Sequence, residues 1–110
     1  MRHFVIDQLS REEKEAVLTH LQTKAQQGPV KDLFWIPLPG ELLSAEQKAH
    51  SQCGPFYLAV EVGEESVTFE LLVRSQSTLH CSCLAYATNP QRDFLLHFID
   101  TMVSQLHLRA

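Results

Sequence analysis

The sequence predicts one α+β domain over residues 1–110, in the order helix, strand, helix, three-stranded antiparallel β-meander and long C-terminal helix. Two observations predict this class. Apolar residues near both ends of the chain recur with the 3.6-residue period of amphipathic helices, whereas those from Phe56 to Ala85 alternate with the two-residue period of strands. A chain of 110 residues can bury one core, so we expect the helices to pack on one face of the sheet.

Three helix starts share one signature, a hydroxyl residue followed three positions later by Glu or Gln, which is typical of a capping box. The matches are Ser10-x-x-Glu13, Ser44-x-x-Gln47 and Thr88-x-x-Gln91. At the third start we predict Asn89 as the cap, because Pro90 then stands at the first helical position. The first two helices are expected to end at Gly28-Pro29 and Gly54-Pro55, where glycine can adopt a left-handed cap and proline cannot continue a helix. The predicted helices cover residues 10–27, 44–52 and 90–107.

The meander is predicted from two alternating stretches, FYLAVEV and VTFELLV, joined by a loop at residues 63–66. Pairing Val62 with Val67 brings every inward residue opposite another, including Phe56 opposite Val73. A third strand over residues 79–85 then follows. A fourth strand is expected at residues 30–36, as an edge strand or extended arm, because Pro37 and Pro39 interrupt regular pairing.

The third predicted strand contains Cys81 and Cys83, and its alternation turns both side chains onto the apolar face, opposite Leu71 and Phe69. Free cysteine is commonly a small core residue, and we predict that role for both. Three cysteines in a chain of this length indicate reduced thiols rather than a disulfide framework.

Zinc binding is the alternative interpretation of the same residues. His50 and Cys53 have a spacing typical of metal ligands, and Cys81 and Cys83 lie about 6.6 Å apart on one strand face. In a three-stranded meander, however, the first and third strands are separated by about 9.6 Å, and only a folded-over loop could bring all four residues to one ion. No cofactor is predicted under the first interpretation, and zinc is predicted under the second.

The sequence contains no recognisable catalytic motif. It lacks a G-x-S-x-G elbow and a glycine-rich phosphate loop, and we predict no catalytic residue. The net charge is −4 and basic residues are scattered singly, so neither nucleic acid nor a membrane surface is an expected partner. Without a signal-peptide core or a membrane-length apolar segment, the protein is expected to be cytoplasmic.

Surplus apolar surface predicts association with a second copy or with another protein. The C-terminal helix is apolar over about 200° of its circumference, which is wider than one sheet contact requires. On the outer face of the sheet, Tyr57, Leu72 and His80 of neighbouring strands are expected to form one row. The extended arm that contains Trp35 is expected to lie near it. The interface candidates are Trp35, Tyr57, Leu72, His80, Leu96 and Val103.

From the sequence we therefore expect a small, non-enzymatic interaction or regulatory binding module that forms a homodimer. A zinc-binding domain is the second hypothesis. A small-ligand sensor or a small enzyme without a recognisable motif is the third.

Overall fold

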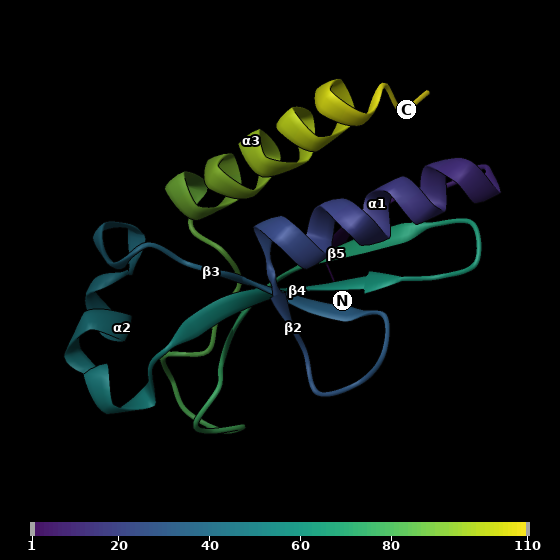
Figure 1. The fold of residues 1–110 in the computed structure, drawn as a ribbon. Coiled ribbons are helices and arrows are strands. Elements are labelled where there is room, and N and C mark those ends of the chain that lie inside the picture. The colour runs from purple at the N-terminus through teal and green to yellow at the C-terminus, as the bar shows by residue number, and fades with distance from the viewer. Residues whose placement is uncertain (1, 110) are drawn as a thin grey trace.

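The computed structural model describes residues 2–109, which form an α+β fold with a five-stranded antiparallel sheet and three α-helices. In chain order the elements are β1 (His3–Ile6), α1 (Arg11–Lys24), β2 (Gln26–Gln27), β3 (Leu33–Pro37), α2 (Ala45–Ala49), β4 (Phe56–Val62), β5 (Val67–Ser75) and α3 (Asn89–Leu106). Two 3-10 turns flank α2, at Gly40–Leu42 and Ser51–Cys53. The strand order is β1-β5-β4-β3-β2. Helices α1 and α3 lie together over one face of the sheet, whereas α2 lies at one end of it (Figure 1).

All three capping boxes form, because each hydroxyl accepts from the backbone N–H three residues later and each longer side chain returns to the cap. The prediction for the third start was wrong in detail. Thr88, not Asn89, is the cap of α3, since its hydroxyl accepts from the backbone N–H of Gln91. Pro90 is still accommodated, because the N–H groups of the first helical turn have no intrahelical partner.

Helix α1 ends at Lys24, three residues before the predicted stop, because Ala25 is extended and the next two residues pair with β3 as the short strand β2. Gly28 is not a left-handed helix cap. Its N–H donates to the carbonyl of Leu33 at 2.7 Å, and a β-carbon at this position would stand 2.8 Å from that oxygen. Glycine is required here for close approach of two backbone segments.

The hairpin of β4 and β5 has the predicted register at its turn, where Val62 pairs with Val67 and Val60 with Phe69. A bulge between Leu58 and Val60 then shifts the pairing by two residues, so that Leu58 faces Val73. The shift is an even number of residues, so the apolar face is preserved beyond the bulge.

The predicted third strand of the meander is wrong. Strand β1, which was not predicted, pairs with residues 67–70 of β5 and occupies the edge assigned to residues 79–85. The chain after β5 leaves the sheet as an irregular loop and returns only at Tyr86, which forms an isolated bridge with Leu72. The predicted fourth strand does form as β3, but between β4 and β2 rather than at an edge.

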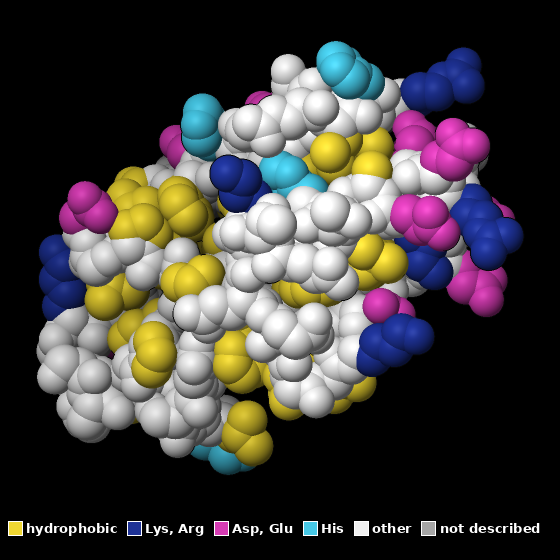
Figure 2. Space-filling model, in the orientation of Figure 1, with side chains coloured by type: hydrophobic (Ala, Val, Ile, Leu, Met, Phe, Trp, Pro, Cys, Tyr) yellow, Lys and Arg dark blue, Asp and Glu magenta, His cyan; other side chains and the backbone are white. Residues whose placement is uncertain are grey.

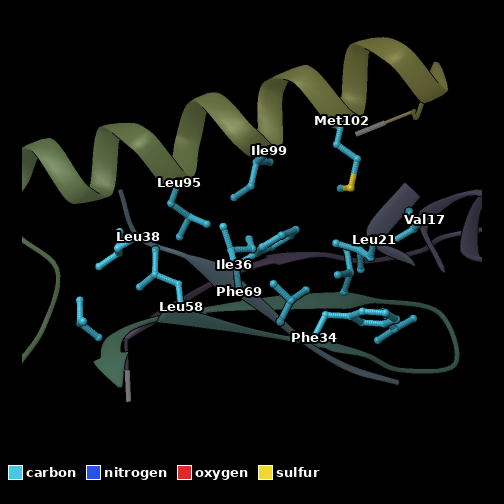
Figure 3. Close-up of a cluster of buried hydrophobic side chains, with 14 of the residues drawn as sticks. Val17, Leu21, Phe34, Ile36, Leu38, Leu58, Phe69, Leu95, Ile99 and Met102 are labelled. Carbon is cyan, nitrogen blue, oxygen red and sulfur yellow. The ribbon is translucent and has the colours of Figure 1, made fainter. Parts of the chain in front are cut away.

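The core lies between the sheet and the two long helices. Figure 3 shows Leu95, Ile99 and Met102 of α3 pointing toward side chains of the sheet and α1. Leu95, Met102 and Phe69 are fully buried. The helices therefore cover one apolar sheet face as predicted.

Charged and hydrophobic side chains are unevenly distributed on the face of the molecule that Figure 2 shows. Figure 2 shows charged side chains gathered where α1 begins and α3 ends, while hydrophobic side chains reach the surface nearer α2. Within residues 2–109, none of the helices has the length and apolar character needed to cross a membrane.

Candidate metal centre

One imidazole and three thiols meet beside α2. His50 follows the last residue of α2, Cys53 ends the adjoining 3-10 turn, and Cys81 and Cys83 come from the loop after β5. One ligand atom from each of the four residues lies within 4.8 Å of the other three. The folded-over loop that a metal site requires is therefore present. The predicted strand placement of Cys81 and Cys83 was wrong, but Cys83 is a buried core residue as predicted, and Cys81 packs against that core.

The sulfur–sulfur distance is close to that of a tetrahedral zinc site, whereas the nitrogen–sulfur distance is that of a hydrogen bond. The Sγ atoms of Cys53 and Cys81 are 3.6 Å apart, and Nδ1 of His50 is 2.9 Å from Sγ of Cys81. Sulfurs bound at about 2.3 Å around a tetrahedral centre stand about 3.8 Å apart. The thiols are free rather than paired, because a disulfide requires a separation of about 2.05 Å.

The loop of Cys81 and Cys83 is built as a tight turn. The N–H of Leu84 donates to the carbonyl of Cys81 at 3.1 Å, and the N–H of Cys83 points at Sγ of Cys81 at 3.5 Å. A backbone N–H directed at a ligating sulfur stabilises its thiolate form. The turn therefore both aims the first sulfur and supports negative charge on it.

The imidazole of His50 is held between a sulfur and a carboxylate. Its Nε2 lies 3.3 Å from Oε1 of Glu46, one helical turn earlier, while Nδ1 faces Cys81. The hydroxyl of Ser82 donates to the same carboxylate oxygen at 3.1 Å. A carboxylate on the far nitrogen of a histidine is the usual outer partner of a metal-binding imidazole, because it fixes the ring and its tautomer.

Buried amide groups tie the cysteine turn to α2 and α3. Gln47 donates from Nε2 to the carbonyl of Cys83 at 3.2 Å, and Gln91 donates to Oε1 of Gln47 and to the carbonyl of Leu42, each at 2.9 Å. Both glutamines are also the third helical residues of capping boxes. A glutamine can close the box with its oxygen and still donate elsewhere with its nitrogen, which a glutamate cannot do.

Ser75, the last residue of β5, anchors the other end of the same loop. Its hydroxyl donates to the carbonyl of Cys53 and accepts from the N–H groups of Ser77 and Thr78. Among the residues that the structure describes, the buried polar side chains are Gln47, Ser75 and Gln91. Gln47 and Ser75 each donate to the backbone carbonyl of a candidate ligand, and Gln91 donates to the side chain of Gln47, so the three buried polar side chains are connected to this place.

The thiols differ in acidity. The pKa of Cys81 is lowered to about 6, first by the hydrogen bond with the Cys83 thiol and then by the Cys83 backbone N–H and His50. Burial raises the pKa of Cys83 to about 12, and burial also raises the pKa of Cys53. Without a cation, only one of the three thiols readily ionises. A bound divalent cation compensates several thiolates at once, because ligating thiols are deprotonated by the metal.

The sequence pointed to the four ligands only as an alternative, and it missed the supporting residues Glu46, Gln47, Ser75 and Gln91. The two buried glutamines had a usable signal, because each takes the capping-box position that Glu13 takes in α1.

Of the interface candidates on the sheet, Trp35 stacks on Tyr57 with ring centroids 4.5 Å apart, and Tyr57 is buried. Tyr57, Leu72 and His80 line one hollow of about 320 Å³ together with Leu79 and Cys81. These residues adjoin the candidate metal ligands, although they do not form a row on adjacent strands.

The two interface candidates on α3, Leu96 and Val103, are half-buried. Val103 packs against the core, so part of the excess apolar width of this helix is used within the chain.

Comparison of the chain with protein-family models, curated proteins and solved structures gives no match.

Proposed function

We propose that this protein is a structural zinc-binding domain, in which one ion joins α2 to the loop after β5. The observation that carries the proposal is the convergence of four ligand atoms from His50, Cys53, Cys81 and Cys83. Three thiolates and one imidazole are a ligand set of structural zinc sites. Soft thiolates disfavour magnesium and calcium, which take oxygen ligands.

Four protein ligands support a structural rather than a catalytic ion, because a catalytic zinc keeps one coordination position for water or substrate. Cys53 is 8% exposed and Cys83 is 1% exposed, so at least half of the ligand set is closed to solvent. In this proposal the ion holds α2 and the loop after β5 in a fixed arrangement, and it does not take part in a reaction.

Elemental analysis tests the proposal directly. Protein expressed in zinc-containing medium and purified without chelator should contain about one equivalent of zinc per chain, and Cys81→Ser with Cys83→Ser should contain none. Leu79→Ala, a change at an exposed loop residue, is the matched control and should retain the metal. Protein that holds no zinc, and takes up none on titration after reduction, would refute the proposal.

A thiol nucleophile is a second candidate, favoured by the chain of contacts from Glu46 through His50 to Cys81. That arrangement is the geometry of a base oriented by a carboxylate and activating a cysteine. The additional thiols of Cys53 and Cys83 have no place in such a dyad, whereas they complete a metal site. A fast, stoichiometric burst of Cys81 labelling in freshly purified native protein would favour the nucleophile over zinc.

Self-association remains a prediction. It is supported by the exposed apolar side chains Leu79 and Val5, which are 81% and 48% exposed. Analytical ultracentrifugation at micromolar concentration would test it, and a monomer at all concentrations would contradict it.

A further inference from the structure

We propose that Cys81 is an oxidation site, and that peroxide converts it with Cys53 into a disulfide that replaces the metal as the link between α2 and the loop after β5. The inference deepens the proposed zinc site, but the pair of thiols on which it depends exists with or without an ion.

Access distinguishes Cys81 from the other two cysteines. It is half-buried and lines the hollow of about 320 Å³, whereas neither Cys53 nor Cys83 lines that hollow and both are buried. The rim of the hollow includes Leu79 and His80, both exposed residues of the same loop. The hollow therefore gives a molecule as small as hydrogen peroxide a path from solvent to Cys81, and it is lined by neither Cys53 nor Cys83.

Cys53 is placed to resolve the oxidised sulfur. Its Sγ lies 3.6 Å from Sγ of Cys81, so a disulfide of about 2.05 Å needs a movement of roughly 1.5 Å. Residues 53 and 81 are 28 positions apart in the sequence, and their side chains already lie against each other. The carbonyl of Cys53 is held by buried Ser75, which keeps this thiol beside the loop.

The chemistry balances with hydrogen peroxide as the oxidant. The Cys81 thiolate attacks one peroxide oxygen, an S–O bond forms, the O–O bond breaks and hydroxide leaves, giving a sulfenic acid. Cys53 then attacks Sγ of Cys81, losing its proton where it is still a thiol; an S–S bond forms, the S–O bond breaks and a second hydroxide leaves. Two protons convert the hydroxides to water. Two electrons pass from the sulfurs to the peroxide, and a dithiol reductant reverses the change.

The consequence for the metal follows from the donor count. Once Cys53 and Cys81 are joined, only His50 and Cys83 remain as ligands. Two ligands bind zinc more weakly than four do, so the ion dissociates on dilution. The disulfide nevertheless joins the same two segments that the ion joined. Oxidation should therefore release zinc while the loop stays attached to α2.

The test uses the full-length protein in two states, zinc-loaded and metal-free, treated with hydrogen peroxide at a few equivalents. Peptide mapping without reduction should find the Cys53–Cys81 disulfide in both states. In the zinc-loaded state, a chromogenic chelator should detect one zinc released per disulfide formed. A Cys81–Cys83 disulfide, sulfinic acid at Cys81 without any disulfide, or zinc release without thiol oxidation would overturn the inference.

Two variants sharpen the result in the metal-free state, with circular dichroism confirming that each is folded. Cys53→Ser should accumulate a sulfenic acid at Cys81 that a cyclic diketone traps, whereas Cys83→Ser should still form the Cys53–Cys81 disulfide. Trapping at Cys83 in the Cys53→Ser variant would contradict the assignment. If the protein bound no zinc but formed the disulfide, the proposed function would fail and the oxidation site would stand. If zinc bound and the disulfide did not form, the reverse would hold.

Discussion

The sheet face under α1 and α3 and the corner beside α2 are filled by different mixtures of side chains. Under the two long helices, fully buried residues such as Phe69, Leu95 and Met102 make an apolar layer that needs no partner beyond close packing. Beside α2, two buried thiols that belong to the same core lie next to a half-buried thiol, a half-buried imidazole and buried amides. Burial of an amide is costly unless it finds a hydrogen bond, so the corner depends on specific polar contacts as well as on hydrophobic burial.

The capping boxes show the same division on a smaller scale. Glu13 closes the box of α1 toward solvent at the charged end of the molecule, whereas Gln47 and Gln91 close theirs in the interior, where they are 2% and 0% exposed. The same local motif therefore has a second role in each helix: Glu13 also accepts from the backbone N–H of Arg109, Gln47 supports the cysteine turn, and Gln91 supports Gln47.

Removing a ligand should have the largest effect and should separate the two regions. For Cys83→Ser we expect zinc affinity to fall by more than the 10–100-fold typical of outer-shell losses, because a first ligand is lost. Hydrogen exchange should accelerate in residues 76–87 and remain slow in β4 and β5. Faster exchange throughout the sheet would show that the corner and the core are one cooperative unit.

Truncating the apolar core should have the converse effect. Phe69→Ala is expected to lower the free energy of unfolding by about 3–5 kcal/mol, because a buried aromatic ring is replaced by a cavity. Denaturant unfolding measures this loss. At 10 °C in the absence of denaturant the variant should still bind one equivalent of zinc, and loss of the metal under folded conditions would contradict the separation.

The buried glutamines can be tested against their exposed counterpart. Gln47→Glu replaces the Nε2 donor with an oxygen that cannot donate to the Cys83 carbonyl. The unsatisfied buried group should lower the free energy of unfolding by about 1–3 kcal/mol. Glu13→Gln, the reciprocal change in the box of α1, keeps an oxygen for the cap N–H and disturbs only the solvent-accessible contact with the Arg109 N–H, so it should lower the free energy of unfolding less than Gln47→Glu does. Equal effects at the two positions would show that the interior hydrogen bonds contribute nothing beyond capping.

The outer partner of the imidazole should have the smallest effect. Glu46→Gln keeps a hydrogen-bond acceptor beside Nε2 of His50 but removes the charge, and zinc affinity should fall about tenfold, at the low end for such partners. A competition titration with a chelator measures this change. Glu41→Gln, at an exposed residue before α2, is the matched control and should leave the affinity unchanged.

The sequence was sufficient for the helix starts and for the hairpin near its turn, because capping boxes and two-residue alternation are local signals. It was misleading after Val73. Alternation continued through Cys81 and Cys83 and predicted a strand, yet the edge of β5 is filled by β1, whose residues pair with partners more than 60 positions away in the chain, from Ile6 with Val67 to His3 with Glu70. Strand pairing at an edge is decided by competition between distant segments, which a local pattern does not record.

The site shows the same limit. The spacing of His50 and Cys53 indicated ligands, but their meeting with the other two cysteines depends on a loop that leaves the sheet. Glu46 and Gln91 carried no metal signal of their own, since their roles arise only from which groups the fold brings near them. The glutamine in place of glutamate at two capping boxes is the one feature that a closer reading of the sequence could have used.

X-ray absorption spectroscopy of the zinc-loaded protein tests the central claim most directly, because it reports the ligands of the ion itself. We predict a first shell of three sulfurs at about 2.3 Å and one nitrogen at about 2.0–2.1 Å. A shell of oxygen and nitrogen alone, or one whose sulfur contribution is unchanged in the Cys81→Ser, Cys83→Ser double variant, would contradict it.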